Sequence, residues 1–328
     1  MKKIVLCADG EWDGRSGLHQ QSNVARLARY LAPNDDNDHV QLSYFEPAKA
    51  GVPNQARLER DLLQAYRFII QNYQAGDLLY CFGFSYGAFL MRLLTGLIDV
   101  CGVLQKHHLA QAERALALYW QLRMDSNDPA AVQFRSHFAV NEQAEVRLVG
   151  LFDCVGEHGV PARYLGNLDD YSVYDNATVP SCVRTGRHAL ALDETRGDYV
   201  QACWDELDGV NLQQVWFSGD HQQLGGLEIE HDGQGLLGDL PLAWMVNQAT
   251  EAGLEFDAGI YAELNPNPLA SIPQARSTFV NYFGRGRRRL QPNHYLHESV
   301  QTRCEQLSYQ ADGLEEFIET VGWQIAVN

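Results

Sequence analysis

The residues of this sequence best suited to chemistry lie in the segment 83–87, which reads Gly-Phe-Ser-Tyr-Gly. An apolar run at 78–82 precedes it, and an apolar helical pattern at 88–94 follows it. This order of strand, sharp turn and helix is typical of a nucleophile elbow, in which the serine hydroxyl stands exposed above a sheet. Glycine at both flanks lets the strand and the helix approach closely. We therefore predict that Ser85 is a nucleophile, with an incidental glycine-rich turn as the alternative.

A serine hydroxyl needs a base to accept its proton, and imidazole suits that role near neutral pH. His221 directly follows a predicted strand at 214–217 and precedes a permissive Gly-Gly pair, so it is the predicted base. His188 lies inside a strand pattern and is a weaker alternative. His297 is a further alternative, which could contact substrate or cap a helix.

A buried carboxylate must hold such an imidazole in the right tautomer. Asp153 ends a convincing buried strand at 146–152 and is the predicted acid. Asp193, which ends a shorter strand, is the alternative, although a charge pair with Arg196 would be an adequate structural reason for it. The resulting order of Ser, Asp and His along the chain is that of α/β-hydrolases.

An oxyanion hole needs N–H donors beside the nucleophile. The backbone of Tyr86 is the predicted first donor, because it follows the serine. The loop Asp9-Gly10-Glu11-Trp12 is predicted to supply the other from Gly10 or Glu11. Asp9, Trp12 and His297 are the candidate substrate contacts. This chemistry requires neither a metal nor a cofactor, and we expect none.

The elements that must position these residues alternate between strands and helices. Strands are predicted at 3–8, 40–45, 78–82, 146–152, 188–192 and 214–217, and helices at 23–31, 54–73, 85–97, 242–252 and 314–321. This alternation predicts an α/β fold with a mostly parallel central sheet flanked by helices. We expect a single domain over 1–328. Residues 104–140 would form a small helical cap or lid, or else ordinary packing helices, and 256–328 a C-terminal extension of loops and helices.

Composition narrows the function classes. The chain has 328 residues, a formal charge of −17 and seven cysteines, none of them in a C-x-x-C pair. The negative charge argues against nucleic acid as a partner, and buried free thiols are the expected state of the cysteines. No apolar run approaches the roughly 18 residues of a membrane span, and the first one is too short for a signal peptide. The basic cluster at 285–289 would bind phosphate groups or, more simply, form a solvated loop.

Taken together, these motifs identify a resemblance. The chain resembles a family of α/β-hydrolase domains that includes the phospholipase effectors of type VI secretion. The segments that carry the resemblance lie at 7–12, 23–27, 65–68, 83–88, 152–156, 188–194, 215–221, 225–226, 243–245 and 297–300.

The resemblance implies a serine esterase or lipase whose triad matches Ser85, Asp153 and His221, and in some members the substrate is a phospholipid acyl ester. It implies a lipid or small-molecule ester as substrate, and a secretion-apparatus or immunity protein as partner. A bacterial, cytoplasmic location in the producing cell follows, with export that needs no cleavable signal. The chain departs from the family in having Tyr86 where Arg is usual and Gln222-Gln223 where Ser-Asp is usual. A thioesterase, a deacetylase or a non-catalytic binding protein on the same fold stays open.

Overall fold

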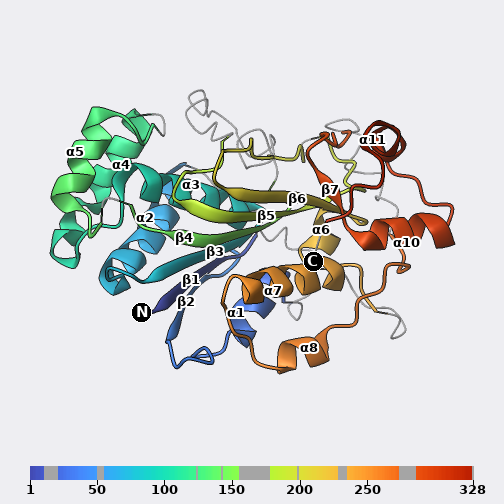
Figure 1. The fold of residues 1–328 in the computed structure, drawn as a ribbon, viewed down its shortest axis with the longest axis horizontal. Helices are drawn as coiled ribbons and strands as arrows, with labels where there is room; N and C mark the ends of the chain where they lie inside the picture. Colours follow the sequence, from blue (N-terminus) through green and yellow to red (C-terminus); the bar gives the residue numbers. More distant parts are fainter. Residues whose placement is uncertain are drawn as a thin grey trace.

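The structure is a computed structural model that describes residues 1–10, 21–49, 55–122, 125–141, 143–154, 178–197, 199–227, 235–272 and 286–326. A parallel sheet in the order β2-β1-β3-β4-β5-β6-β7 forms its centre (Figure 1). Its strands are β1 (Lys3–Ala8), β2 (Gln41–Glu46), β3 (Leu78–Phe84), β4 (Val146–Phe152), β5 (Val183–Ala191), β6 (Asn211–Phe217) and β7 (Tyr295–Leu296). The predicted α/β fold with a parallel sheet flanked by helices is confirmed.

Helices cover both faces of this sheet. One face carries α2 (Gln55–Asn72) and α3 (Tyr86–Cys101), and the other carries α1 (Asn23–Tyr30), α7 (Asp239–Glu251) and α8 (Gly259–Glu263). The short α6 (His221–Leu224) follows β6, whereas α10 (Glu298–Gln306) and α11 (Leu314–Val321) pack beside β6 and β7.

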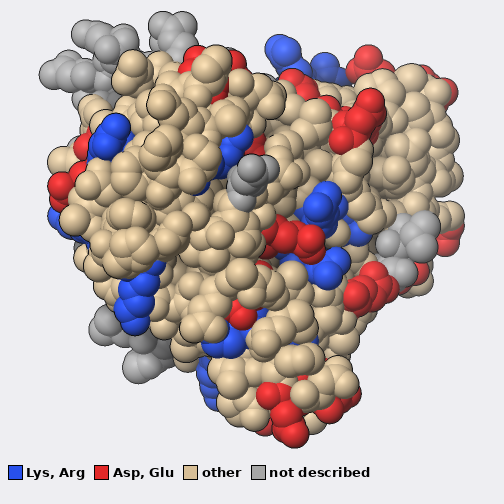
Figure 2. Space-filling view, turned by 60° about the vertical axis from the view of Figure 1, so that its left-hand side comes forward, with Lys and Arg blue, Asp and Glu red and all other residues tan. Residues whose placement is uncertain are grey.

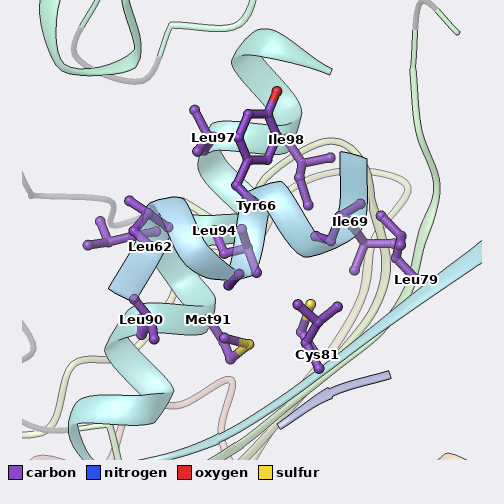
Figure 3. Packing of buried hydrophobic residues seen from close by; sticks show 14 of the residues in the cluster. Leu62, Tyr66, Ile69, Leu79, Cys81, Leu90, Met91, Leu94, Leu97 and Ile98 are labelled. Atoms are coloured by element: carbon purple, nitrogen blue, oxygen red, sulfur yellow. The ribbon is translucent and has the colours of Figure 1, made fainter. Parts of the chain in front are cut away.

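The alternation of side chains along β1 explains the two layers. Ile4, Leu6 and Ala8 belong to the core cluster under α2 and α3, and the residues between them, Val5 and Cys7, face α1 and α7. Successive side chains of a strand point to opposite faces, so a strand covered on both faces is apolar throughout. Figure 3 shows the first cluster, in which α2 and α3 direct large apolar side chains toward each other above β3.

The strand order places a switch point at the carboxyl ends of β1 and β3. The chain leaves β1 for β2 on one side and returns through α2 to β3 on the other side of β1. In open α/β sheets, ligands bind outside the carboxyl ends of the strands at such a switch point. Gly10 and Ser85 follow these two strands, so both lie at this point.

Residues 104–140 contain the 3₁₀ helix η1 (Lys106–Gln111) and the helices α4 (Ala112–Gln121) and α5 (Pro129–Phe138). They pack on the C-terminal end of α3, where Arg135 donates to the carbonyls of Asp99 and Val100 at 3.3 and 2.8 Å. A helix of 16 residues is about 24 Å long, so this contact lies roughly 20 Å from Ser85. Figure 1 shows α4 and α5 at the far end of the sheet. Of the two expectations for this segment, the structure agrees with packing helices and not with a lid over Ser85.

The structure extends several predicted elements. The strand predicted at 188–192 spans Val183–Ala191, and the region beyond residue 256, predicted as loops and helices, also contains β7 and α10. Within the described residues, no helix is long and apolar enough to cross a membrane. On the face shown in Figure 2, lysine and arginine side chains lie beside aspartate and glutamate, so positive charge does not gather there into one large patch.

Candidate active site

Ser85 stands on the turn between β3 and α3. Its backbone has φ 53° and ψ −118°, which is rare for a residue with a side chain and costs on the order of 1–3 kcal/mol. The turn is held because the Ser85 N–H donates to the Phe152 carbonyl at 3.1 Å. The flanking glycines are required by contact: a Cβ on Gly87 would lie 2.0 Å from the Ala8 oxygen, and one on Gly83 would lie 2.4 Å from the Gly87 oxygen.

The structure brings Ser85, His221 and Asp153 into one hydrogen-bonded chain. His221 Nε2 lies 2.9 Å from Ser85 Oγ, and His221 Nδ1 lies 2.7 Å from Asp153 Oδ2. The exposed fractions of Ser85, His221 and Asp153 are 6%, 4% and 0%, so water competes little for these hydrogen bonds. An ionised carboxylate can only accept, so Nδ1 carries the proton and Nε2 accepts from the serine hydroxyl. This is the protonation state in which an imidazole can take the serine proton.

Strand register explains why residues so distant in sequence meet. Phe84 pairs with Phe152, so Ser85 and Asp153, which come next in the chain, follow neighbouring strand ends. His221 follows the end of β6 after a short turn, and its ring packs against that of Phe84 with centroids 4.8 Å apart. The parallel arrangement places all three residues at the same edge of the sheet.

Asp153 is held by more than the imidazole. Its φ is 40°, and its N–H donates to the Ala189 carbonyl at 2.8 Å. Oδ1 accepts from the Ala191 N–H and from Arg288 Nη1, both at 3.0 Å, and Oδ2 accepts from Arg288 Nη2 at 2.8 Å. Burial opposes the charged form, but the Arg288 charge and the His221 hydrogen bond outweigh it and hold the pKa of Asp153 well below its usual range.

The turn that carries His221 has its own support. Asp220 caps α6 by accepting from the N–H groups of Gln222 and Gln223, and the Gln223 side chain accepts from the Asp220 N–H in return. This capping box gives the unusual Gln223 a local structural role. Asp193, the alternative acid, accepts from the Gly219 N–H at 2.7 Å, so it stabilises the turn between β6 and His221.

The Tyr86 side chain contacts α2. Its hydroxyl donates to Asp61 of α2 at 3.2 Å, and the Arg57 guanidinium lies 5.1 Å from its ring centroid. Tyr86, which stands where the family usually has Arg, therefore contributes to the contact between α2 and α3. The Tyr86 backbone opens α3, where the elbow motif expects an oxyanion donor.

Gly10 lies close to the nucleophile. A Cβ on Gly10 would come within 3.1 Å of the Ser85 Cβ, and its N–H donates to the Asp9 side chain at 2.8 Å. Burial raises the pKa of Asp9, although hydrogen bonds from Ser22 and Gly10 oppose that rise. Asp9 thus links the backbone of Gly10 to Ser22. Glu11 and Trp12, also predicted at this site, lie outside the described residues.

The remaining candidate histidines have structural partners. His188 is fully buried in β5, where its Nε2 accepts from the Cys154 N–H at 3.1 Å, and burial lowers its pKa to about 3. His297 is the N-cap of α10, accepting from the Ser299 N–H at 3.3 Å and stacking on Phe217 with centroids 4.5 Å apart. The structure thus shows His297 as a helix cap, and its contact with substrate stays a prediction.

Arg288 is the site residue that sequence reasoning missed. The basic cluster to which it belongs predicts a solvated loop or a phosphate site. In the structure, Arg288 is only 3% exposed and donates hydrogen bonds to Asp153. Arg287 and Arg289 beside it are exposed, and Arg285 lies outside the described residues. No local pattern distinguishes the inward-facing arginine from its neighbours.

The described part of the chain holds no cluster of three or more His, Cys, Asp or Glu side chains that could bind a metal. An open hollow of about 420 Å³ lies between α4 and α5, lined in part by Arg114, Phe134 and Phe138. It is at the opposite end of α3 from Ser85, so it is separate from the hydrogen-bonded chain.

The fold and this geometry define an α/β protein with an elbow serine, an imidazole and a carboxylate at the carboxyl edge of a parallel sheet. The chain belongs to the Tle1-like phospholipase effector family of type VI secretion, whose catalytic-domain model matches residues 2–248. The expected family resemblance is thereby confirmed, and the chain is assigned to a family of phospholipase-type hydrolases.

Similar proteins include an uncharacterized protein of Saccharomyces cerevisiae, YEL023C, which is 27% identical over 233 residues. That match covers 62% of this chain and 33% of the yeast protein, so the chain spans about a third of that relative. The Tle1 effector bound to the VgrG spike of the type 6 secretion system is 15% identical, with a TM-score of 0.48 over 87% of this chain and 84% of that one. An uncharacterized protein from Pseudomonas aeruginosa is also 15% identical, with a TM-score of 0.46 over 81% of this chain and 49% of that one.

Proposed function

We propose that this protein is a serine esterase of the lipase type that cleaves carboxylic esters through a covalent acyl-enzyme. The observation that carries the proposal is the continuous hydrogen-bonded chain from Ser85 Oγ through His221 to Asp153. The membership of a phospholipase family supports the reaction class. The buried setting of all three residues supports it further, because electrostatic interactions strengthen where water is excluded.

The reaction follows from the roles that this geometry allows. Ser85 Oγ attacks the ester carbonyl carbon while its proton passes to His221 Nε2, and the carbonyl oxygen becomes an oxyanion. The N–H of Tyr86 stabilises that oxyanion, and the proposed second donor is Glu11, since the Gly10 N–H donates to Asp9. The imidazolium then protonates the leaving alcohol, which departs and leaves an acyl group on Ser85. Water, deprotonated by His221, attacks the acyl-enzyme and releases the carboxylic acid.

Phospholipid acyl esters are the substrate class that we propose within this reaction, because the family is one of phospholipase effectors. A similar protein, the Tle1 effector, is described as bound to the VgrG spike of the type 6 secretion system. By analogy we propose a secretion-apparatus partner for this chain, with synthesis in the bacterial cytoplasm and export without a cleavable signal.

The test is hydrolysis of p-nitrophenyl esters of increasing chain length and of phosphatidyl substrates. Ser85→Ala is the test variant, and Ser136→Ala, which changes an exposed serine on α5, is the matched control. We expect turnover of long-chain or phosphatidyl substrates by the wild type and the control, and none by Ser85→Ala. Turnover of short esters alone would restrict the enzyme to small molecules.

A fluorophosphonate probe tests the nucleophile without any choice of substrate. We expect it to label the wild type and the Ser136→Ala control but not the Ser85→Ala variant. A folded wild-type protein that neither hydrolyses esters nor takes up the probe would refute the enzymatic proposal and favour a binding protein on this fold.

A further inference from the structure

Arg288 is bound to the acid of the proposed triad by a buried, bidentate ion pair. Its Nη1 and Nη2 donate to the two oxygens of Asp153 at 3.0 and 2.8 Å, and its side chain is 2% exposed. A planar guanidinium fixes a carboxylate in both position and rotation, which a single donor does not. Arg288 lies beyond the segment 2–248 that the family model matches, so the C-terminal part of the chain contributes to the site.

Contacts with other segments of the chain fix the backbone on both sides of Arg288. The Gly286 N–H donates to the Thr195 carbonyl at 2.8 Å, and the Gln201 side chain donates to the Arg289 carbonyl at 2.9 Å. A Cβ on Gly286 would lie 2.8 Å from the Arg196 oxygen, so only glycine permits this approach. The backbone is thereby held on both sides of the arginine.

The pair also determines the charge that His221 faces. Around this imidazole lie Asp153 and Arg288, then Glu194 and Arg196, which are paired with each other at 2.6 Å. The Tyr199 ring meets the imidazole edge-on at 5.0 Å, and Asp220 precedes it in the chain. The ion pair of Asp153 with Arg288 is neutral as a unit, so the carboxylate stabilises an imidazolium less than it would alone.

We propose that Arg288 is a positioning residue for the Ser85–His221–Asp153 chain: it fixes the Asp153 carboxylate and compensates the negative charge that faces His221. This inference rests on the proposed function, because it assigns Arg288 a role through the triad. Arg288 acts on the imidazole through Asp153 and has no direct role at the ester.

The test compares Arg288→Gln and Arg288→Lys with Arg287→Gln, a matched change at an exposed neighbour. The measurements are kcat and KM for one ester, the rate of fluorophosphonate labelling from pH 5 to 9, and thermal unfolding. We expect Arg288→Gln to lower kcat and the labelling rate roughly 10- to 100-fold, with KM changed less than about threefold. Loss of the positive charge leaves Asp153 an uncompensated anion, so the acid limb of the labelling profile should move to higher pH.

Arg288→Lys keeps the positive charge but loses the bidentate hydrogen bonding to Asp153. We expect it to leave the acid limb near the wild-type position and to recover part of the rate, whereas Arg287→Gln should match the wild type throughout. If Arg288→Gln does not fold, Arg288→Lys decides the matter: a wild-type rate in that variant would overturn the proposal.

The outcomes also separate this inference from the proposed function. Ser85→Ala that retained activity would overturn the triad itself. An inactive Ser85→Ala together with a folded Arg288→Gln of wild-type rate and pH profile would leave the triad standing and overturn the role of Arg288. A slow Arg288→Gln with an unshifted profile and no recovery by Lys would assign Arg288 to the fold alone.

Discussion

Replacement of Asp153 by Asn should damage activity and stability together, because the carboxylate serves four donors at once. These donors are the Ala191 N–H, both terminal nitrogens of Arg288 and His221 Nδ1, at 2.7 to 3.0 Å. An asparagine of the same size offers one oxygen, and its NH₂ group must face donors in either orientation. The substitution therefore leaves two donors without an acceptor and Arg288 without its counter-charge.

The expected loss of stability follows from the broken ion pair with Arg288. Breaking a buried pair by removing one partner costs about 3–5 kcal/mol, since a buried charge stays uncompensated. With about 2.1 cal/mol/K of unfolding entropy per residue, 328 residues give roughly 0.7 kcal/mol/K. The Tm of Asp153→Asn should therefore fall by about 4–7 °C. An amide facing His221 also favours the tautomer with the proton on Nε2, which should lower kcat roughly 10⁴-fold.

The assay is ester hydrolysis in parallel with thermal unfolding followed by circular dichroism. Ser85→Ala should lose activity and keep the wild-type Tm, because its hydroxyl holds no fold contact beyond His221 among the bonds described. Asp193→Asn is the matched control at the neighbouring strand. It should keep activity within about tenfold, since one amide oxygen can still accept from Gly219 and Tyr309.

Two results would refute this reasoning. One is an Asp153→Asn variant with the Tm of the wild type, which would mean that the Arg288 pair contributes nothing to folding. The other is an Asp193→Asn variant that loses as much activity as Asp153→Asn, which would transfer the orienting role to Asp193.

Gly87→Ala should abolish soluble, folded protein, because its Cβ would lie 2.0 Å from the Ala8 oxygen; expression and circular dichroism test this, and a folded variant would contradict the close packing. Tyr86→Phe should destabilise by about 1 kcal/mol through loss of the bond to Asp61 while esterase activity changes less than threefold, as measured by urea unfolding and initial rates. Burial lowers the pKa of His188 to about 3, below its unfolded value near 6.5, so its share of stability is complete above pH 6.5 and is lost as the pH falls. The free energy of unfolding should fall by about 2 kcal/mol from this residue between pH 7 and 5, and His188→Gln should flatten that slope; an unchanged slope would contradict it.

The local sequence determined the elements that carry the site. The strands at 3–8 and 146–152 and the helix at 314–321 have the predicted bounds, because a largely continuous apolar run defines each strand and apolar periodicity defines the helix. β7 and α10 were not predicted. β7 has two residues, and α10 is a largely polar helix, so neither produces a strong apolar pattern.

The sequence likewise predicted some features of the candidate site, and others needed the structure. The sequence predicted Ser85, Asp153 and His221 because each follows a strand. The carboxyl ends of parallel strands lie at the same side of a sheet, independently of the loops that connect them. The choice between Asp153 and Asp193 needed the structure, since both end strands and only the register shows which faces His221.

The sequence by itself thus specified an α/β sheet with an elbow serine, and a base and an acid in the expected order. Tertiary structure alone decided that residues 104–140 lie far from Ser85, that His297 caps a helix and that Arg288 turns inward. The physical reason is that these placements depend on contacts between distant segments, such as that of Gly286 with Thr195. A run of arginines reads as solvated surface until such a contact buries one of them against a carboxylate.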